Sequence, residues 1–396
     1  MTTRRTFLHR LGATALGATL PVRLSFAAAA GEARLVVVLL RGGWDGLNVA
    51  PPHGDPNYGR LRPRIGVPPP GNAGGALDMD GLIGLNPELA ALKAWYDGGE
   101  LVAFPAMGIG YAKRSHFDAQ DVLENGTGRP KGAYDGWLGR ALMAKGDGLA
   151  PPSLAVNHSV PLILRGKYPA QTLAPSRLPT PDGDFLDRVR ALYRLDAAFE
   201  RPFETALKAA RGEGAAMMKG LGGGGRGGRL NTKLVAAAGR VLAGADGPRV
   251  AVIDTGGWDT HGREGPRLRA QLTGLAKGLV ALRQGLGAAW ANTAILLVSE
   301  FGRTAAENGS AGTDHGTGGL AFALGGAVRG GRIVGGWPGL APGALYQGRD
   351  LRATGDIRAL FKAALRDHLG LAEGALEDQV FPDSRQIRPL EGLFRS

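Results

Sequence analysis

Residues 34–48 read RLVVVLLRGGWDGLN, and this stretch decides the fold that the sequence predicts. It begins with a continuous run of Val and Leu, without the alternation of a strand that faces water on one side. Such a run indicates a strand buried on both faces, as in a parallel sheet covered by helices. The glycines and polar residues after it, Asp45 among them, stand where α/β folds place ligand sites.

Further apolar runs predict more buried strands, and helical patterns lie between them. The strands are predicted at residues 101–105, 249–254 and 293–299, with two short ones near a sheet edge at 320–324 and 332–334. The helices are predicted at residues 86–95, 117–124, 266–286 and 356–368. Strands that alternate with helices predict an α/β fold with a mostly parallel central sheet flanked by helices.

The length of 396 residues suits one large α/β domain, which we expect over residues 31–396. Residues 185–245 predict a mostly helical insertion, broken by the glycine-rich piece 222–228. No buried strand precedes that piece, and no Lys-Ser/Thr follows it, as both would in a phosphate-binding loop. A flexible linker is therefore the preferred interpretation.

The N-terminal residues resemble a secretion leader. The segment TRRTFL (residues 3–8) precedes an apolar stretch and then the small-residue run 27–30. This order resembles the twin-arginine export motif, followed by the apolar region and cleavage site of a leader. A short amphipathic helix is the alternative, but no acidic residue occurs before Glu32. We expect residues 1–30 to be a signal peptide cleaved near Ala30, export by the twin-arginine machinery, and a periplasmic or secreted mature protein.

Composition excludes several other functions. The net charge is +12, but the arginines are scattered, without the basic patch and interleaved aromatics of a nucleic-acid-binding protein. A modest positive field suits an anionic small-molecule or polymer substrate. Beyond the leader, no apolar segment reaches the length of about 20 residues that spans a bilayer. Since the chain has no cysteine, a metal would need His, Asp, Glu or neutral oxygen ligands.

Acidic residues and histidines follow four of the predicted strands. The carboxyl ends of parallel strands lie along one edge of a sheet, so these residues can meet there. Carboxylates held close together repel unless a cation compensates them. The sequence thus predicts one or two divalent metal ions (Zn²⁺, Mn²⁺, Mg²⁺ or Ca²⁺) at this edge. The candidate ligands are Asp45, Asp254, Asp259, His261, Glu300, Asp314 and His315.

Several of these residues have other interpretations. Asp45 also fits a turn, since Asp-Gly is a turn signal, and residues 259–261 also fit a loop that caps the next helix. Glu300 also fits an ion pair with Arg303, and His116 an ordinary residue in the first turn of a helix. The histidines interpreted as structural or surface residues are His53, His158 and His368.

Six motifs together resemble a known family. They are RGGWDGLN (41–48), RSHF (114–117), GWLGR (136–140), GGWDTH (256–261), SEFGRT (299–304) and GTDHG (312–316). With the leader, they resemble the exported bacterial family of the domain of unknown function 1501, which has no settled activity. That family is similar in layout to the alkaline phosphatase and sulfatase superfamily. The resemblance implies an alkaline-phosphatase-like three-layer sandwich.

The superfamily's layout also implies metal ligands. An Asp after the first strand binds a metal, as Asp45 would here. Asp254 and Asp259 lie five residues apart, the spacing of an acid and a metal-binding Asp on a later strand. The resemblance implies His261 and His315 as further ligands of the metal.

In the superfamily a Ser or Thr nucleophile begins a helix. Here His116 stands at that place, and Ser115 precedes it, so the nucleophile is either Ser115 or water, and His116 is an alternative ligand. Glu300 stands where the superfamily has an Asp-His pair, and it is a candidate ligand of a second ion. Arg114 and Arg303 would stabilise the charge that develops on an anionic ester, or they balance the acids.

Two functional hypotheses follow from these residues. The first is a metal-dependent hydrolase of phosphate or sulfate esters outside the cytoplasm. The second is a non-catalytic relative that keeps the fold and a metal but binds a glycan, an envelope polymer or a partner protein. The missing Asp-His pair favours the second hypothesis.

Overall fold

The computed structural model describes residues 32–146, 152–175, 182–196, 200, 203–204, 207 and 230–395. The expected signal peptide and the glycine-rich piece lie outside these residues. Among the helices that are described, none has the length and apolar character that crossing a membrane requires.

Nine strands of the described residues form one sheet, in the order β10-β4-β9-β8-β1-β7-β5-β6 with β11 beside β4. Every neighbouring pair is parallel except the two that β9 makes with β4 and β8. The predicted mostly parallel sheet is therefore confirmed. Its strands are β1 Arg34–Leu40, β4 Leu101–Gly108, β5 Ser153–Val156, β6 Ala170–Thr172, β7 Val250–Thr255, β8 Thr293–Val298, β9 Gly319–Leu324, β10 Arg332–Ile333 and β11 Gly355–Asp356.

Strand β1 lies inside the sheet, between β7 and β8, and all of its residues are buried. Its side chains alternate between two cores. Leu35, Val37 and Leu39 pack in one core, and the residues between them pack in the other. Each fully buried Val or Leu contributes roughly 1.5–3 kcal/mol, which explains why the continuous apolar run fixes β1 in this place.

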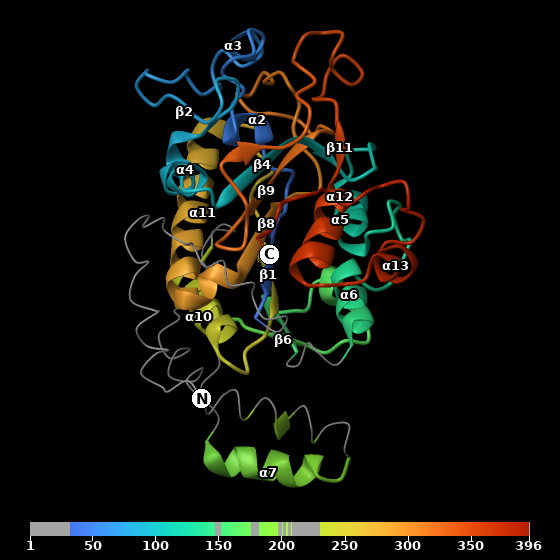
Figure 1. Ribbon diagram of the computed structural model, residues 1–396. Coiled ribbons are helices and arrows are strands. Elements are labelled where there is room, and N and C mark those ends of the chain that lie inside the picture. Colours follow the sequence, from blue (N-terminus) through green and yellow to red (C-terminus); the bar gives the residue numbers. More distant parts are fainter. Residues whose placement is uncertain are drawn as a thin grey trace, which may run out of the picture.

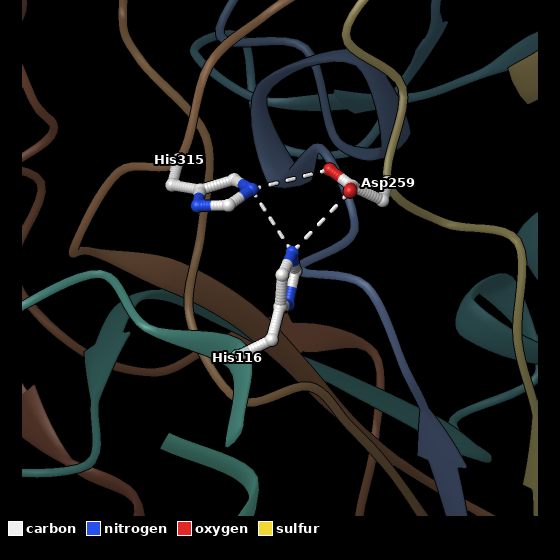
Figure 2. Close-up of side chains that lie close together, drawn as sticks. All are labelled: His116, Asp259 and His315. Atoms are coloured by element: carbon white, nitrogen blue, oxygen red, sulfur yellow. Dashed lines mark hydrogen bonds and ion pairs between the residues drawn. The ribbon is translucent and has the colours of Figure 1, made fainter. Parts of the chain in front are cut away.

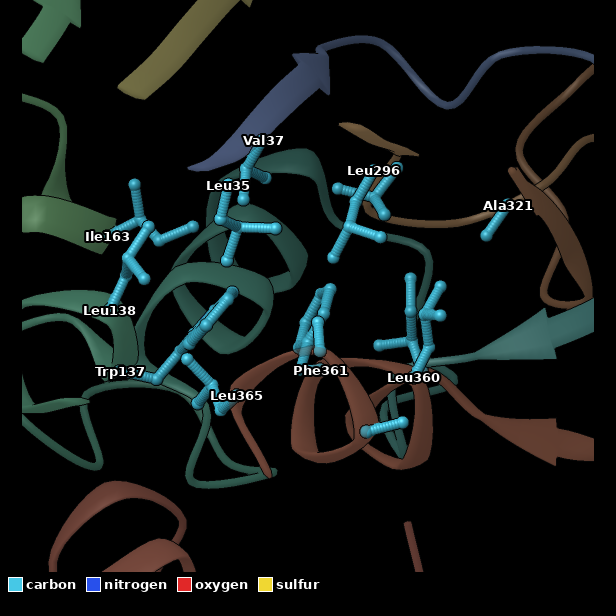
Figure 3. Close-up of a cluster of buried hydrophobic side chains, with 14 of the residues drawn as sticks. Leu35, Val37, Trp137, Leu138, Ile163, Leu296, Ala321, Leu360, Phe361 and Leu365 are labelled. Atoms are coloured by element: carbon cyan, nitrogen blue, oxygen red, sulfur yellow. The ribbon is translucent and has the colours of Figure 1, made fainter. Parts of the chain in front are cut away.

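Helices cover both faces of the sheet (Figure 1). On one face lie α4 Ala90–Asp97, α10 Thr232–Ala243 and α11 Glu264–Leu286. On the other face lie α5 His116–Asn125, α6 Trp137–Lys145 and α12 Ile357–Ala363. Figure 3 shows the core between the sheet and this second group of helices, which contains Leu35 and Val37. In it Trp137 stacks on Phe361 with ring centroids 4.5 Å apart. The chain is thus a three-layer α/β sandwich with a mostly parallel central sheet, as expected.

Helix α10 belongs to the helical layer, because it packs closely along α11. A Cβ on Gly239 would lie 2.7 Å from the Leu282 carbonyl oxygen and 3.0 Å from Gly285. Only glycine therefore permits this close approach of the two helices. Helix α7 Gly183–Tyr193, from the same region 185–245, has no buried residue, whereas α10 is partly buried. The two helices of this region therefore differ in how far they are buried.

The remaining described α-helices and strands are short: α2 Gly46–Val49, α3 Tyr58–Leu61, α13 Glu373–Ala375, and the hairpin of β2 Leu77–Asp78 with β3 Gly84–Leu85. One sequence prediction was wrong: residues 320–324 were expected near a sheet edge, but β9 lies between β4 and β8. Its apolar run fits an interior strand of either direction. The predicted C-terminal helix ends as α12 at Ala363, and a π-helical turn follows over residues 364–368.

The register of the parallel strands brings several loops together. Leu40 at the end of β1 pairs with Thr255 of β7, and Leu39 pairs with Val298 of β8. The residues that follow these three strands therefore leave the sheet at the same edge. Gly42 lets two of the loops touch, since a Cβ there would lie 2.5 Å from the amide nitrogen of Asp259.

Candidate metal site

Three histidines from separate loops meet at this edge. His116 is the first residue of α5, His261 follows β7, and His315 lies in the loop before β9. The Nε2 atom of His315 lies 2.9 Å from the Nε2 of His116 and 2.9 Å from the Nε2 of His261. Figure 2 shows His116 and His315 pointing toward each other and toward Asp259.

The partners of the other ring nitrogens assign the tautomers. The Nδ1 of His315 lies 3.0 Å from the carbonyl oxygen of Arg114, which can only accept a hydrogen bond. The Nδ1 of His116 lies 2.7 Å from Glu300 Oε1, and that of His261 lies 3.1 Å from Asp314 Oδ1. With each Nδ1 donating its hydrogen outward, each Nε2 would present a lone pair to the shared space.

Asp259 completes the cluster. Its Oδ1 lies 3.0 Å from the Nε2 of His261 and 3.3 Å from that of His315, and its Oδ2 lies 3.4 Å from the Nε2 of His116. Burial raises the pKa of Asp259, but the hydrogen bond from Arg303 at 2.7 Å and the histidines outweigh it and lower the pKa. The Asp259 carboxylate thus faces the Nε2 atoms of all three imidazoles.

This arrangement fits a metal ion. Lone pairs 2.9 Å apart repel each other unless a proton or cation lies between them. With Zn–N and Zn–O bonds of about 2.0–2.1 Å, the ligand atoms of a tetrahedral zinc site lie about 3.3 Å apart. The separations of 2.9–3.4 Å are close to that value. His116, Asp259 and His315 form a group whose ligand atoms all lie within 4.8 Å of one another. His261 stands outside this group, with its Nε2 2.9 Å from His315 Nε2 and 3.0 Å from Asp259 Oδ1.

Glu300 lies behind His116, away from the shared space. Its carboxylate is buried, and besides His116 it accepts hydrogen bonds from the Gly42 amide at 2.8 Å and Gln120 Nε2 at 2.9 Å. Burial raises the pKa of Glu300, but the bonds from His116 and Gln120 outweigh it and lower the pKa. An ionised Glu300 orients the imidazole and makes it a better ligand, as carboxylates behind metal-bound histidines do.

Replacing Glu300 with Gln is expected to lower the zinc affinity by about 10–100-fold, the usual loss when such an outer partner is removed. Competition with a zinc chelator measures this. Glu307→Gln is the matched control, because Glu307 is also a well-covered carboxylate but pairs with Arg64 outside the cluster. Equal affinities of the two variants would contradict the role given to Glu300.

The acidic residues and arginines that flank the cluster form hydrogen bonds and ion pairs with one another or with the histidines. Asp254 receives two hydrogen bonds from Arg41 Nε, at 2.8 and 2.7 Å, and burial raises the pKa of Asp254. Asp314 pairs with His261 and stands behind it, as Glu300 does behind His116. Arg303 is buried and binds Asp259 and the main chain of Thr313.

The predicted catalytic residues lie beside the cluster. Arg114 is about one-quarter exposed and binds Asp350 at 2.8 Å. Ser115 caps α5, with its hydroxyl oxygen 3.5 Å from the amide nitrogen of Asp118. His116, the next residue, is the one whose ring reaches the other histidines. The helix start thus presents an imidazole to the site and uses the serine to begin the helix.

Asp45 is held apart from the histidines. Its carboxylate is fully buried, and Arg62 binds both of its oxygens. Glu264, the first residue of α11, lies beside this pair and accepts hydrogen bonds from Asn48 and Thr313. Sequence reasoning missed Arg62 and Glu264 because no motif or spacing marks either of them. The three expected structural histidines contact groups outside the cluster or lie at the surface: His53, His158 and His368.

Comparisons with known proteins bear on the fold and the family. The structure resembles that of Ps i-CgsB in complex with k-i-k-neocarrahexaose, at 9% identity and TM-score 0.41, covering 88% of this chain and 73% of that one. It resembles the phosphonate monoester hydrolase of Agrobacterium radiobacter, at 13% identity and TM-score 0.36, covering 86% and 74%. The PsFucS1 sulfatase from Pseudoalteromonas sp. gives 13% identity and TM-score 0.39, covering 91% and 71%.

No curated protein sequence matches the chain. The family described as "Protein of unknown function (DUF1501)" matches residues 190–379. Three of the six motifs, at residues 256–261, 299–304 and 312–316, fall inside this match. The resemblance that the motifs predicted is therefore confirmed, and over residues 190–379 the chain carries the DUF1501 sequence pattern.

Proposed function

We propose that this protein is a metal-dependent hydrolase of phosphate or sulfate esters. The observation that carries the proposal is the meeting of the His116 and His315 Nε2 atoms and the Asp259 carboxylate at one edge of the sheet, with His261 beside them. Nitrogen ligands together with one oxygen ligand favour zinc over magnesium or calcium. The expected twin-arginine leader, residues 1–30, supports a place of action outside the cytoplasm.

The residues that would hold the ion are His116, Asp259 and His315, which leave the fourth position of a tetrahedral site for water, next to His261. When bound there, a divalent metal supplies a Lewis acid for the ester oxygen and lowers the pKa of a coordinated water. Glu300 and Asp314 hold the Nδ1 protons of their histidines, so that the Nε2 atoms stay available.

The site is open to solvent on the side where His261 and Asp259 lie. Their side chains are 47% and 41% exposed, whereas those of His116 and His315 are 23% and 25% exposed. A substrate would therefore approach over His261 and Asp259. Arg114 is the partly exposed arginine whose main chain also binds His315, and we assign to it the binding of the anionic ester.

The nucleophile in this proposal is water. The hydroxyl of Ser115 accepts the amide hydrogen of Asp118 and so serves as a helix cap. Losing such a cap costs about 1 kcal/mol of stability but leaves the metal ligands in place. The same observation favours the second candidate function, a non-catalytic protein that binds a glycan, an envelope polymer or a partner at the metal site.

Turnover of an aryl phosphate or an aryl sulfate by the zinc-loaded protein tests the proposal. We expect turnover that chelation abolishes and zinc restores, and we expect Ser115→Ala to retain more than about one-tenth of it. His53→Ala is the matched control, since His53 pairs with Asp78 away from the cluster. A zinc-loaded protein that is inert toward both ester classes would favour the binding function instead.

A further inference from the structure

At this edge of the sheet, a second group of oxygen atoms is arranged as the ligands of a cation are. The guanidinium of Arg62 is fully buried, and oxygen atoms surround it. Its Nη2 lies 2.9 Å from Asp45 Oδ1 and 2.8 Å from the carbonyl oxygen of Thr304, and its Nε lies 2.9 Å from the carbonyl oxygen of Ala305. Its Nη1 binds the other oxygen of Asp45.

A carboxylate and two main-chain carbonyls are the ligand set that hard cations such as Ca²⁺ take in proteins. Glu264 and Asn48 add a second carboxyl and an amide next to it, and they bind each other at 2.9 Å. The oxygen atoms that a metal would use are therefore present. In the native chain the guanidinium of Arg62 binds the oxygen atoms of Asp45, Thr304 and Ala305 in place of a metal ion.

Arg62 fills the space within this group, Asp45, Arg62 and Glu264. Its guanidinium lies at hydrogen-bond distance from the Asp45 carboxylate and the two main-chain carbonyls, so it leaves no space for a divalent ion between them. Burial raises the pKa of Asp45, but Arg62 outweighs it and lowers the pKa. Burial, and then the neighbouring Asp45, raise the pKa of Glu264 to about 8.

We propose that Arg62 occupies the position of a second cation, so that the chain binds one metal ion, and that removing Arg62 opens a calcium site at Asp45, Thr304, Ala305 and Glu264. The first part rests on the proposed function, because the single ion is the one held by the histidines. The second part depends only on the oxygen atoms around Arg62. It differs from the expectation, drawn from the family resemblance, that Asp45 is a ligand in the native chain.

The experiment compares the wild-type chain with Arg62→Ala, Asp45→Asn and the double variant. Zinc and calcium contents are measured after equilibration with both ions. We expect one zinc and no calcium in the wild type and in Asp45→Asn. Arg62→Ala is expected to hold one zinc and one calcium, with a melting temperature that rises on adding calcium. The double variant is expected to lose the calcium and its stabilising effect.

A second ion in the wild type that Asp45→Asn removes would overturn the inference while leaving the proposed function intact. A folded Arg62→Ala chain that takes up no calcium would overturn it as well. If Arg62→Ala does not fold even with calcium present, the calcium site is refuted, and the ion count of the wild type and Asp45→Asn still decides the single-ion claim. A wild type without zinc would refute the proposed function and the single-ion claim together.

Discussion

Replacing Asp259 and His315 together with alanine is expected to reduce the bound zinc from one ion per chain to a small fraction of an ion. The change removes two of the three proposed ligands, Asp259 and His315, whose Oδ1 and Nε2 atoms lie 3.3 Å apart. Outer-shell partners alone are worth about 10–100-fold in metal affinity, so losing two direct ligands is expected to cost more than about 10³-fold. Elemental analysis after dialysis against a fixed free zinc concentration measures the change.

The matched control is the double variant His53→Ala, Asp78→Ala. It removes a histidine and an aspartate that contact each other at 2.9 Å, as in the cluster, but next to the short β2–β3 hairpin. This control is expected to keep its zinc. If the Asp259 and His315 variant retains a full equivalent of zinc, the ion is bound elsewhere and the cluster is not the metal site.

The largest loss of stability is expected from Arg62→Met. Arg62 and Asp45 have no exposed side-chain surface, so the substitution leaves the Asp45 carboxylate buried and unpaired. Removing one partner of a buried ion pair costs about 3–5 kcal/mol in the free energy of unfolding. Urea unfolding, followed by the fluorescence of the buried tryptophans, measures this cost.

Lys93→Met is the control for that measurement. Lys93 pairs with Asp97 at 2.6 Å, one helical turn away, and the Asp97 side chain is 57% exposed. Pairs of this kind contribute about 0.3–0.5 kcal/mol. Equal stability of the two variants would mean that Asp45 finds another partner or is protonated, and it would remove the basis for treating Arg62 as an internal cation.

The layered fold followed from local sequence patterns. The run of Val and Leu in residues 34–40 is buried on both faces of the sheet, which its lack of alternation indicated. Parallel strands joined by helices then bring their carboxyl ends to one edge, so the meeting of Asp259, His261 and His315 was accessible to sequence reasoning. The position of β9 in the sheet could not be predicted, because an apolar run does not indicate the direction of a strand or which strands lie beside it.

The sequence also did not predict which partners the charged side chains bind. Glu300 lies 184 residues from His116 along the chain, and its position behind the imidazole depends on how β8 and α5 pack. Asp45 follows a buried strand as a ligand would, yet Arg62, in a loop 17 residues later, takes both of its oxygens. Sequence spacing locates a residue on an element, but the pairing of side chains depends on tertiary contacts.

The most direct test of the account is a crystal structure of the zinc-loaded wild-type chain, with anomalous diffraction recorded on both sides of the zinc absorption edge. One anomalous peak is expected, within bonding distance of the Nε2 atoms of His116 and His315 and of the Asp259 carboxylate. A peak at Asp45, or a zinc-loaded crystal with no peak among the three histidines, would contradict it.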